Sequence, residues 1–190
     1  MLEVEIKVAQ PSAEAAAAAL GSHGFRLEKA RRLESNWLWD DAAGSLRARG
    51  ELLRLRRSGE AWLLTFKAAA VAGPHKSRDE IETGVADGEA ARALLQALGY
   101  RETFVYERYR TTYGDGQGEA VIDETPLGVY LELEGPPAWI DAIAARLGFS
   151  RQDYILASYA GLFQEAVRKH GWRIRNFTFA EIALAENERP

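Results

Sequence analysis

Charged and aliphatic residues alternate along one short segment after another in this chain. Residues 2–8 read Leu-Glu-Val-Glu-Ile-Lys-Val, in which every second side chain is charged and the others are aliphatic. Strict alternation of this kind is the pattern of a β-strand with one polar face and one apolar face. By the same criterion we predict further strands over residues 33–40, 52–57, 61–67, 76–85, 103–113, 119–124 and 128–134.

Short polar or glycine-containing segments connect several of these strands. Ser58-Gly59-Glu60 and residues 125–127 have the composition of tight turns, so the strands that they join are expected to be antiparallel. Residues 114–118 form a glycine-rich run, which we interpret as a longer hairpin turn and not as a phosphate loop, because no suitably spaced helix follows. Apolar residues at helical spacing predict helices over residues 13–22, 88–98, 136–147, 155–171 and 180–186.

The charged faces of the predicted strands discriminate between two arrangements. An open sheet would expose its charged face to solvent, whereas a closed barrel would enclose the charges and cover its outside with helices. Solvated strand faces favour Thr, Ser, Gln and Lys, but this chain places arginines or glutamates in pairs at i and i+2, as in Arg54 with Arg56 and Glu80 with Glu82. We therefore predict an α+β fold, a closed eight-stranded antiparallel β-barrel (a tunnel) with flanking helices.

The paired charges also predict what the interior binds. Arginine pairs suit bidentate contacts with phosphate oxygens. Glutamate pairs brought together from the first and last strands would repel one another unless a cation lay between them. Mg²⁺ and Mn²⁺ are bound by a few carboxylates together with substrate phosphates. The interior is therefore expected to bind phosphate groups together with divalent metal ions.

Length and composition limit the alternatives. The 190 residues suit one domain, although a two-domain division stays open, and the net charge of −4 argues against a broad basic surface for nucleic acid. The chain has no cysteine, which excludes disulfides, thiolate zinc sites and a cysteine nucleophile. Neither a signal peptide nor a membrane span is visible, so we expect a cytoplasmic protein without membrane contact. The sequence does not fix the oligomeric state, and a homodimer stays open.

Several strand motifs, taken in order, resemble those of one family. Glu3-Val4-Glu5-Ile6-Lys7 matches an ExExK signature, and residues 123–134 match a D-x-x-x-L-G-x-(aromatic)-x-E-(aliphatic)-E ending. Between them stand Leu53-Arg54-Leu55-Arg56, Leu64-Thr65-Phe66-Lys67 and Arg78-Asp79-Glu80-Ile81-Glu82, and Ser158-Tyr159 follows on the last helix. Over residues 2–165 the chain thus resembles the CYTH proteins, or triphosphate tunnel metalloenzymes, which include class IV adenylyl cyclases and thiamine and inorganic triphosphatases. Leu38 departs from the pattern, since a tyrosine is usual there.

The resemblance implies roles for the charged residues. The residues implied to bind metal, Mg²⁺ or Mn²⁺, are Glu3, Glu5, Asp123, Glu132 and Glu134, with support of a basic neighbour as the alternative for Asp123. The residues implied to bind substrate phosphate are Lys7, Arg54, Arg56, Lys67, Lys76, Arg78, Arg108 and Arg110. The predicted catalytic residues are Lys7, Glu80 and Glu82, of which the two glutamates either orient the attacking water or balance the arginines. We expect packing roles, and not a base-stacking platform, for the aromatic residues Trp62, Phe66, Phe104 and Tyr106.

The function implied by these roles is enzymatic. We expect a divalent-metal-dependent phosphohydrolase that acts on inorganic triphosphate, thiamine triphosphate or a nucleoside triphosphate. The alternative is a class IV adenylyl cyclase, which makes cyclic AMP and pyrophosphate from ATP, and the rival of a different class is a non-catalytic binder of polyphosphate or nucleotide. We assign residues 1–170 to a single tunnel domain and residues 171–190 to a C-terminal extension of unknown role, expected to dock through its aromatic residues.

Overall fold

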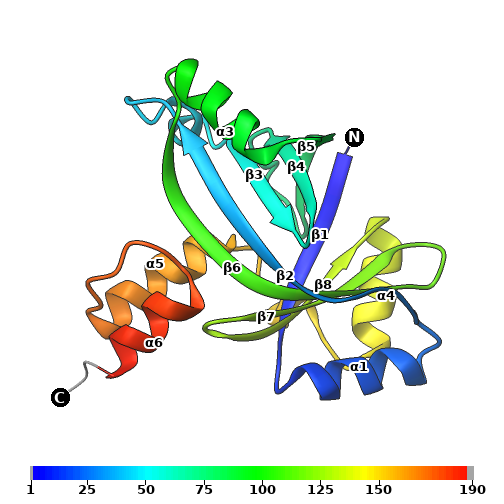
Figure 1. Cartoon of the computed structure of the whole chain (residues 1–190). Helices are drawn as coiled ribbons and strands as arrows, with labels where there is room; N and C mark the ends of the chain where they lie inside the picture. The colour runs from blue at the N-terminus through cyan, green and yellow to red at the C-terminus, as the bar shows by residue number, and fades with distance from the viewer. Residues whose placement is uncertain (1, 188–190) are drawn as a thin grey trace.

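Eight strands close on themselves in the computed structural model, which describes residues 2–187 (Figure 1). Every pair of neighbours is antiparallel, and the order around the barrel is β1-β5-β4-β3-β2-β6-β7-β8. The strands are β1 (Leu2–Gln10), β2 (Arg26–Asp40), β3 (Leu52–Ser58), β4 (Ala61–Lys67), β5 (Lys76–Val85), β6 (Arg101–Gly114), β7 (Glu119–Thr125) and β8 (Gly128–Glu134). The predicted closed antiparallel barrel is confirmed.

The alternation in β1 assigns its side chains to the two faces of the barrel wall. Glu5 and Lys7 line the interior, whereas Ile6 and Val8 lie on the outer face, where both are 0% exposed. A strand with period-2 alternation places successive side chains on opposite faces. Helices cover the outer face around Ile6 and Val8, so this part of the wall is buried on both sides, by apolar packing outside and by charge pairing inside.

The helices pack around the outside of the barrel (Figure 1). They are α1 (Ala13–Ser22), α2 (Ser45–Ala48), α3 (Gly88–Ala97), α4 (Pro137–Arg146), α5 (Tyr159–His170) and α6 (Phe179–Asn187), with a 3₁₀ turn at Arg151–Asp153. Leu20 of α1 and Ile140 of α4 pack with Ile6 and Leu133 of the barrel, and all four are 0% exposed. Burying an aliphatic side chain contributes about 1.5–3 kcal/mol, so this cluster is a main source of stability.

Two predicted element boundaries differ from the structure by more than two residues. β2 begins at Arg26 instead of residue 33, because its first half is exposed and shows no apolar alternation, yet pairs with the end of β6. α5 begins at Tyr159 instead of Ile155. Ser158 caps that helix by accepting a hydrogen bond from the Gly161 amide at 3.2 Å, while the Ile155 amide donates to the Lys7 carbonyl oxygen at 2.8 Å. The short helix α2 was not predicted.

The segment that follows α5 docks on β6, as expected from its aromatic residues. The Phe177 amide donates to the Val105 carbonyl oxygen at 2.8 Å, and the Glu107 amide donates to the Phe177 carbonyl oxygen at 3.0 Å. Phe177 is 0% exposed, among the aromatic residues of α5 and β6. Residues 171–187 thus add a short stretch of backbone pairing to the free edge of β6; residues 188–190 of the predicted extension lie outside the described part of the chain.

None of the helices between residues 2 and 187 combines the length and the apolar character that a membrane span requires.

Candidate functional site

The barrel encloses a cavity of about 720 Å³. Its wall includes residues from all eight strands and from the first turn of α5, and cations outnumber carboxylates among them. The predicted site residues that line it are Glu3, Glu5, Lys7, Arg54, Arg56, Lys67, Lys76, Arg78, Glu80, Glu82, Arg108, Arg110, Glu132 and Glu134. The structure therefore gathers all the predicted residues around one cavity except Asp123, which lies directly behind its wall.

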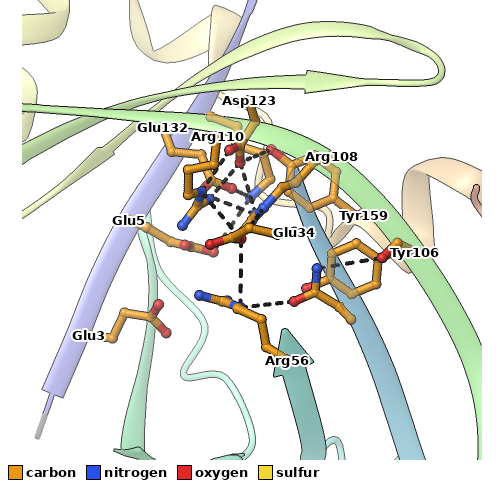
Figure 2. Close-up of polar contacts among 12 residues, drawn as sticks. Glu3, Glu5, Glu34, Arg56, Tyr106, Arg108, Arg110, Asp123, Glu132 and Tyr159 are labelled. Carbon is orange, nitrogen blue, oxygen red and sulfur yellow. Dashed lines mark hydrogen bonds and ion pairs between the residues drawn. The ribbon is translucent and has the colours of Figure 1, made fainter. Parts of the chain in front are cut away.

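Asp123 is held by two guanidinium groups and one phenol (Figure 2). Its carboxylate accepts hydrogen bonds from Arg108 Nη1 at 2.9 Å, from Arg110 Nε at 2.7 Å and from the Tyr159 hydroxyl at 2.7 Å. Asp123 is 0% exposed. These contacts correspond to the second of its two expected roles, the support of basic neighbours.

Glu34 of β2 is a site residue that the sequence argument missed. Its Oε2 accepts from Arg108 Nε at 3.0 Å and lies 3.7 Å from Arg56 Nε (Figure 2). Burial by itself raises the pKa of Glu34, but Arg108 and Arg56 outweigh that effect and hold the pKa well below its usual range. The available signal was the alternation of residues 33–40, which places Glu34 on the same strand face as Asn36.

The arginines of β3 reach into the cavity from the opposite wall. Arg54 Nη2 donates to the Thr65 hydroxyl at 3.1 Å and lies 3.4 Å from Glu82, while Arg54 Nε has no hydrogen-bond partner within residues 2–187. Arg56 Nε donates to Asn36 Oδ1 at 2.9 Å. Burial and the neighbouring Arg54 lower the pKa of Arg56 to about 10. Guanidinium groups are thus buried close to one another with their charges only partly balanced.

Lysines contact the carboxylates of β1 and β5. Lys67 Nζ lies 2.5 Å from Glu3 and 2.6 Å from Glu80, and Lys76 Nζ lies 2.5 Å from Glu5. These contacts of Glu80, like that of Glu82 with Arg54, correspond to charge balance. A catalytic role for these two glutamates stays a prediction.

Lys7 is placed between two of the predicted metal-binding carboxylates. Its Nζ lies 3.0 Å from Glu132 and 3.5 Å from Glu5, and Glu132 also contacts Arg110. Burial by itself lowers the pKa of Lys7, but Glu132 and Glu5 raise it well above the usual value. Lys7 is therefore a permanent cation of the tunnel.

The carboxylates near the start of β1 and the end of β8 repel one another. Burial and then the charges of Glu3 and Glu5 raise the pKa of Glu134 to about 7, and burial and Glu5 raise the pKa of Glu3. Burial also acts to raise the pKa of Glu5, but Lys7 and Lys76 outweigh it and bring that pKa to about 2. Crowded carboxylate oxygens of this kind are the ligands that a hard divalent cation prefers.

The described residues do not bring three acidic or histidine side chains together on one metal-sized point, because lysines lie between the carboxylates. The chemistry of the donors Glu3, Glu5 and Glu134 nevertheless fits a divalent cation, since its two positive charges relieve the repulsion among the three carboxylates. The metal set Glu3, Glu5, Asp123, Glu132 and Glu134 stays a prediction.

Tyr106 packs as predicted, among aromatic side chains. Its ring lies 6.1 Å from that of Phe104 and 6.0 Å from that of Tyr159. Its hydroxyl, however, reaches the cavity wall and accepts a hydrogen bond from Arg54 Nη1 at 3.3 Å. Trp62 does pack as predicted, stacked 5.5 Å from Trp37 on the outside of the barrel.

Comparisons with known proteins agree with this architecture. The CYTH domain family matches residues 1–159. A Methanocaldococcus jannaschii protein named "putative adenylate cyclase" is 30% identical over 135 residues, which are 70% of this chain and 77% of the relative.

Solved structures share the fold at lower sequence identity. A protein from Vibrio parahaemolyticus, described as a "putative adenylate cyclase", has a TM-score of 0.78 at 18% identity, covering 86% of this chain and 98% of its own. A Hippeastrum protein, described as a "putative adenylyl cyclase" with a dominant triphosphatase activity, has a TM-score of 0.62 at 17% identity. The match covers 87% of this chain and 95% of the Hippeastrum chain.

Proposed function

Since the chain belongs to the CYTH domain family, we propose that it is a divalent-metal-dependent phosphohydrolase of a triphosphate compound. One observation carries the proposal: the buried guanidinium groups of Arg54, Arg56 and Arg108 line one cavity of about 720 Å³. Burying like charges together costs several kcal/mol per ion, and an anionic ligand offsets that cost. A triphosphate group brings several negative charges into a space whose wall carries more cations than carboxylates.

In the proposed complex the cations of the wall bind the phosphate oxygens. The guanidinium groups of Arg54, Arg56, Arg108 and Arg110 are planar and donate several hydrogen bonds each, and Lys7 adds a single charge. Glu34 and Asp123 hold Arg108 in place, so its donors are already oriented when the substrate enters. Preorganised donors stabilise charge on phosphate oxygens without further rearrangement, which is the largest part of catalysis in phosphoryl transfer.

We assign the divalent cation to Glu3, Glu5 and Glu134, with Glu132 as a further donor. When bound there, Mg²⁺ or Mn²⁺ supplies charge neutralisation on the phosphate oxygens and lowers the pKa of coordinated water. Lys67 and Lys76, which contact Glu3 and Glu5 in the structure, are then free to turn toward phosphate.

The reaction that we propose is hydrolysis of the terminal phosphate. A water oxygen adds to the terminal phosphorus, the bridging phosphorus–oxygen bond breaks, orthophosphate leaves, and the proton of the water passes to solvent. Glu80 or Glu82 orients that water, and Thr65 fixes Glu82 by donating a hydrogen bond at 2.7 Å.

Adenylyl cyclase activity is the second candidate function, favoured by the name of the Methanocaldococcus jannaschii relative. Cyclisation needs the same triphosphate site and also a place for adenine. The aromatic residues that line the cavity are Tyr106 and Tyr159, and both rings pack against other aromatic side chains. The described cavity therefore offers no free aromatic face for stacking, which supports hydrolysis as the first choice.

The deciding experiment incubates the purified protein with inorganic triphosphate, thiamine triphosphate and ATP, each with Mg²⁺ or Mn²⁺. We expect orthophosphate release that chelation by EDTA abolishes. Cyclic AMP and pyrophosphate from ATP would reverse the order of the two functions. Glu5→Gln should abolish turnover and keep the fold; a Glu5→Gln protein with full activity would contradict the metal assignment, and a wild type that binds triphosphate without turnover would support the non-catalytic binder.

A further inference from the structure

Tyr106 has an apolar ring environment and a polar end that reaches the cavity. The ring belongs to a buried cluster that includes Tyr159 and Phe163 of α5 and Phe177 of the docked C-terminal segment. Only 6% of the residue is exposed. Its hydroxyl lies on the cavity wall beside Arg54, so packing fixes where the oxygen points.

Two hydrogen-bond donors at this point of the wall have no acceptor among residues 2–187. The Tyr106 hydroxyl accepts from Arg54 Nη1, and no described residue accepts its own hydrogen. Arg54 Nε, nearby on β3, also has no partner. Buried donors are nearly always paired, and an unpaired one in a native structure requires an explanation. A ligand with several acceptor oxygens, placed between the two groups, supplies it.

The adjacent Tyr159 provides an internal comparison. The two rings are 6.0 Å apart, but the Tyr159 hydroxyl donates to Asp123 at 2.7 Å and is fully used within the protein. Burial and then Asp123 raise the pKa of Tyr159 well above its usual value. Tyr159 is therefore a fixed structural donor, whereas the hydroxyl of Tyr106 is available.

The surroundings of Tyr106 also differ in charge from those of Tyr159. The charged or titratable groups that face it are Arg54 and Arg56 from β3, Arg108 from its own strand, and Tyr159 from α5. Burial raises the pKa of Tyr106, but the three arginines outweigh burial and bring the pKa to about 8. Near neutral pH the phenol keeps its hydrogen, and an incoming polyanion strengthens that state.

We propose that Tyr106 is a substrate-binding residue of the tunnel, which donates its hydroxyl hydrogen to a phosphate oxygen held at the same time by Arg54. This inference rests on the proposed function, since it concerns the same triphosphate site. It adds a neutral donor to a wall of cations, and it explains why a tyrosine hydroxyl is placed at the inner end of an aromatic cluster.

The test is Tyr106→Phe, which keeps the ring and removes the hydroxyl. The dissociation constant for inorganic triphosphate with Mg²⁺ is measured by calorimetry at pH 7, with KM and kcat from orthophosphate release. A hydrogen bond to a charged group corresponds to a rise of about 10- to 100-fold in the dissociation constant. The matched control is Tyr109→Phe on the same strand, whose ring packs on Phe179, and it should bind like the wild type.

A second readout distinguishes donation from packing. Above pH 8 the free wild type carries a phenolate that repels the substrate and must take up a proton to bind. The advantage of the wild type over Tyr106→Phe should therefore shrink about tenfold between pH 7 and pH 9. Loss of packing alone would give a ratio independent of pH.

The outcomes separate this inference from the proposed function. If the wild type binds and hydrolyses triphosphate and Tyr106→Phe binds within twofold of it at pH 7, the inference fails and the function stands. A difference between the two proteins that is unchanged at pH 9 also overturns it. A wild type that does not bind triphosphate overturns both.

Discussion

Replacing Asp123 by asparagine tests whether the arginines of the tunnel depend on an internal anion. Asp123 is 0% exposed and accepts hydrogen bonds from Arg108, Arg110 and Tyr159. Asn keeps the shape of the side chain and removes its charge, so the two buried guanidinium groups lose a carboxylate that both contact and keep only Glu34 and Glu132. Breaking a buried ion pair by removing one partner costs about 3–5 kcal/mol. For a chain of this length that corresponds to a fall in Tm of roughly 6–20 °C.

The assay is urea unfolding at pH 7, followed by circular dichroism, with thermal melting as the second measurement. Asp79→Asn is the matched control, because Asp79 lies on the exposed outer face of β5 and surface changes usually stay within about 0.5 kcal/mol. If Asp123→Asn lowered the free energy of unfolding by less than about 1 kcal/mol, or by no more than the control does, Asp123 would not be a counter-ion of the buried arginines. A change in the slope m would instead indicate altered two-state unfolding.

Further predictions concern ionisation, metal binding and the C-terminal segment. Ultraviolet titration of the substrate-free protein should show one tyrosine that ionises near pH 8, because the arginines favour the phenolate of Tyr106. This transition should be missing in Tyr106→Phe. Ionisation of every tyrosine near pH 10 would contradict the prediction. Mn²⁺ at 100 times its Kd should raise the Tm of the metal-free protein by about 5–10 °C. Glu134→Gln should reduce that rise. Glu60→Gln should leave it unchanged, because the Glu60 side chain is 98% exposed. In urea unfolding, Phe177→Ala should lower the free energy of unfolding by about 3–5 kcal/mol, whereas Leu184→Ala should lower it little, because Leu184 is 62% exposed on α6. Equal losses in the two variants would mean that docking on β6 adds nothing to stability.

The alternation of charge predicted the barrel and most of its lining residues, for a reason that is local to each strand. Successive side chains of a strand point to opposite faces, so the residues of β1 and β5 that point inward can be identified without knowing their neighbours. The same rule misses residues where alternation is irregular. Lys29 and Arg32 of β2 line the cavity, but they lie where register shifts interrupt the pairing with β6.

Helix boundaries depended on partners that are far away in the chain. The apolar spacing of residues 155–166 is helical throughout, yet Ile155 pairs with the backbone of Lys7 and the helix begins only after Ser158. A tertiary contact thus overrode local propensity at Ile155. The short helix α2 has a local origin instead, since the Asp40 carboxylate accepts hydrogen bonds from the amides of Leu46 and Arg47.

The sequence by itself determined that most strands of this protein gather their charges on one face, because period-2 alternation is a property of each strand alone. Only the tertiary structure decided which charges meet. Glu34 and Arg108 are 74 residues apart in the chain and 2.9 Å apart in space, and Asp123 reaches both Arg108 and Arg110 because β6 and β7 are neighbours. Closure and register set these distances, and with them the difference between a paired carboxylate such as Asp123 and a crowded one such as Glu134.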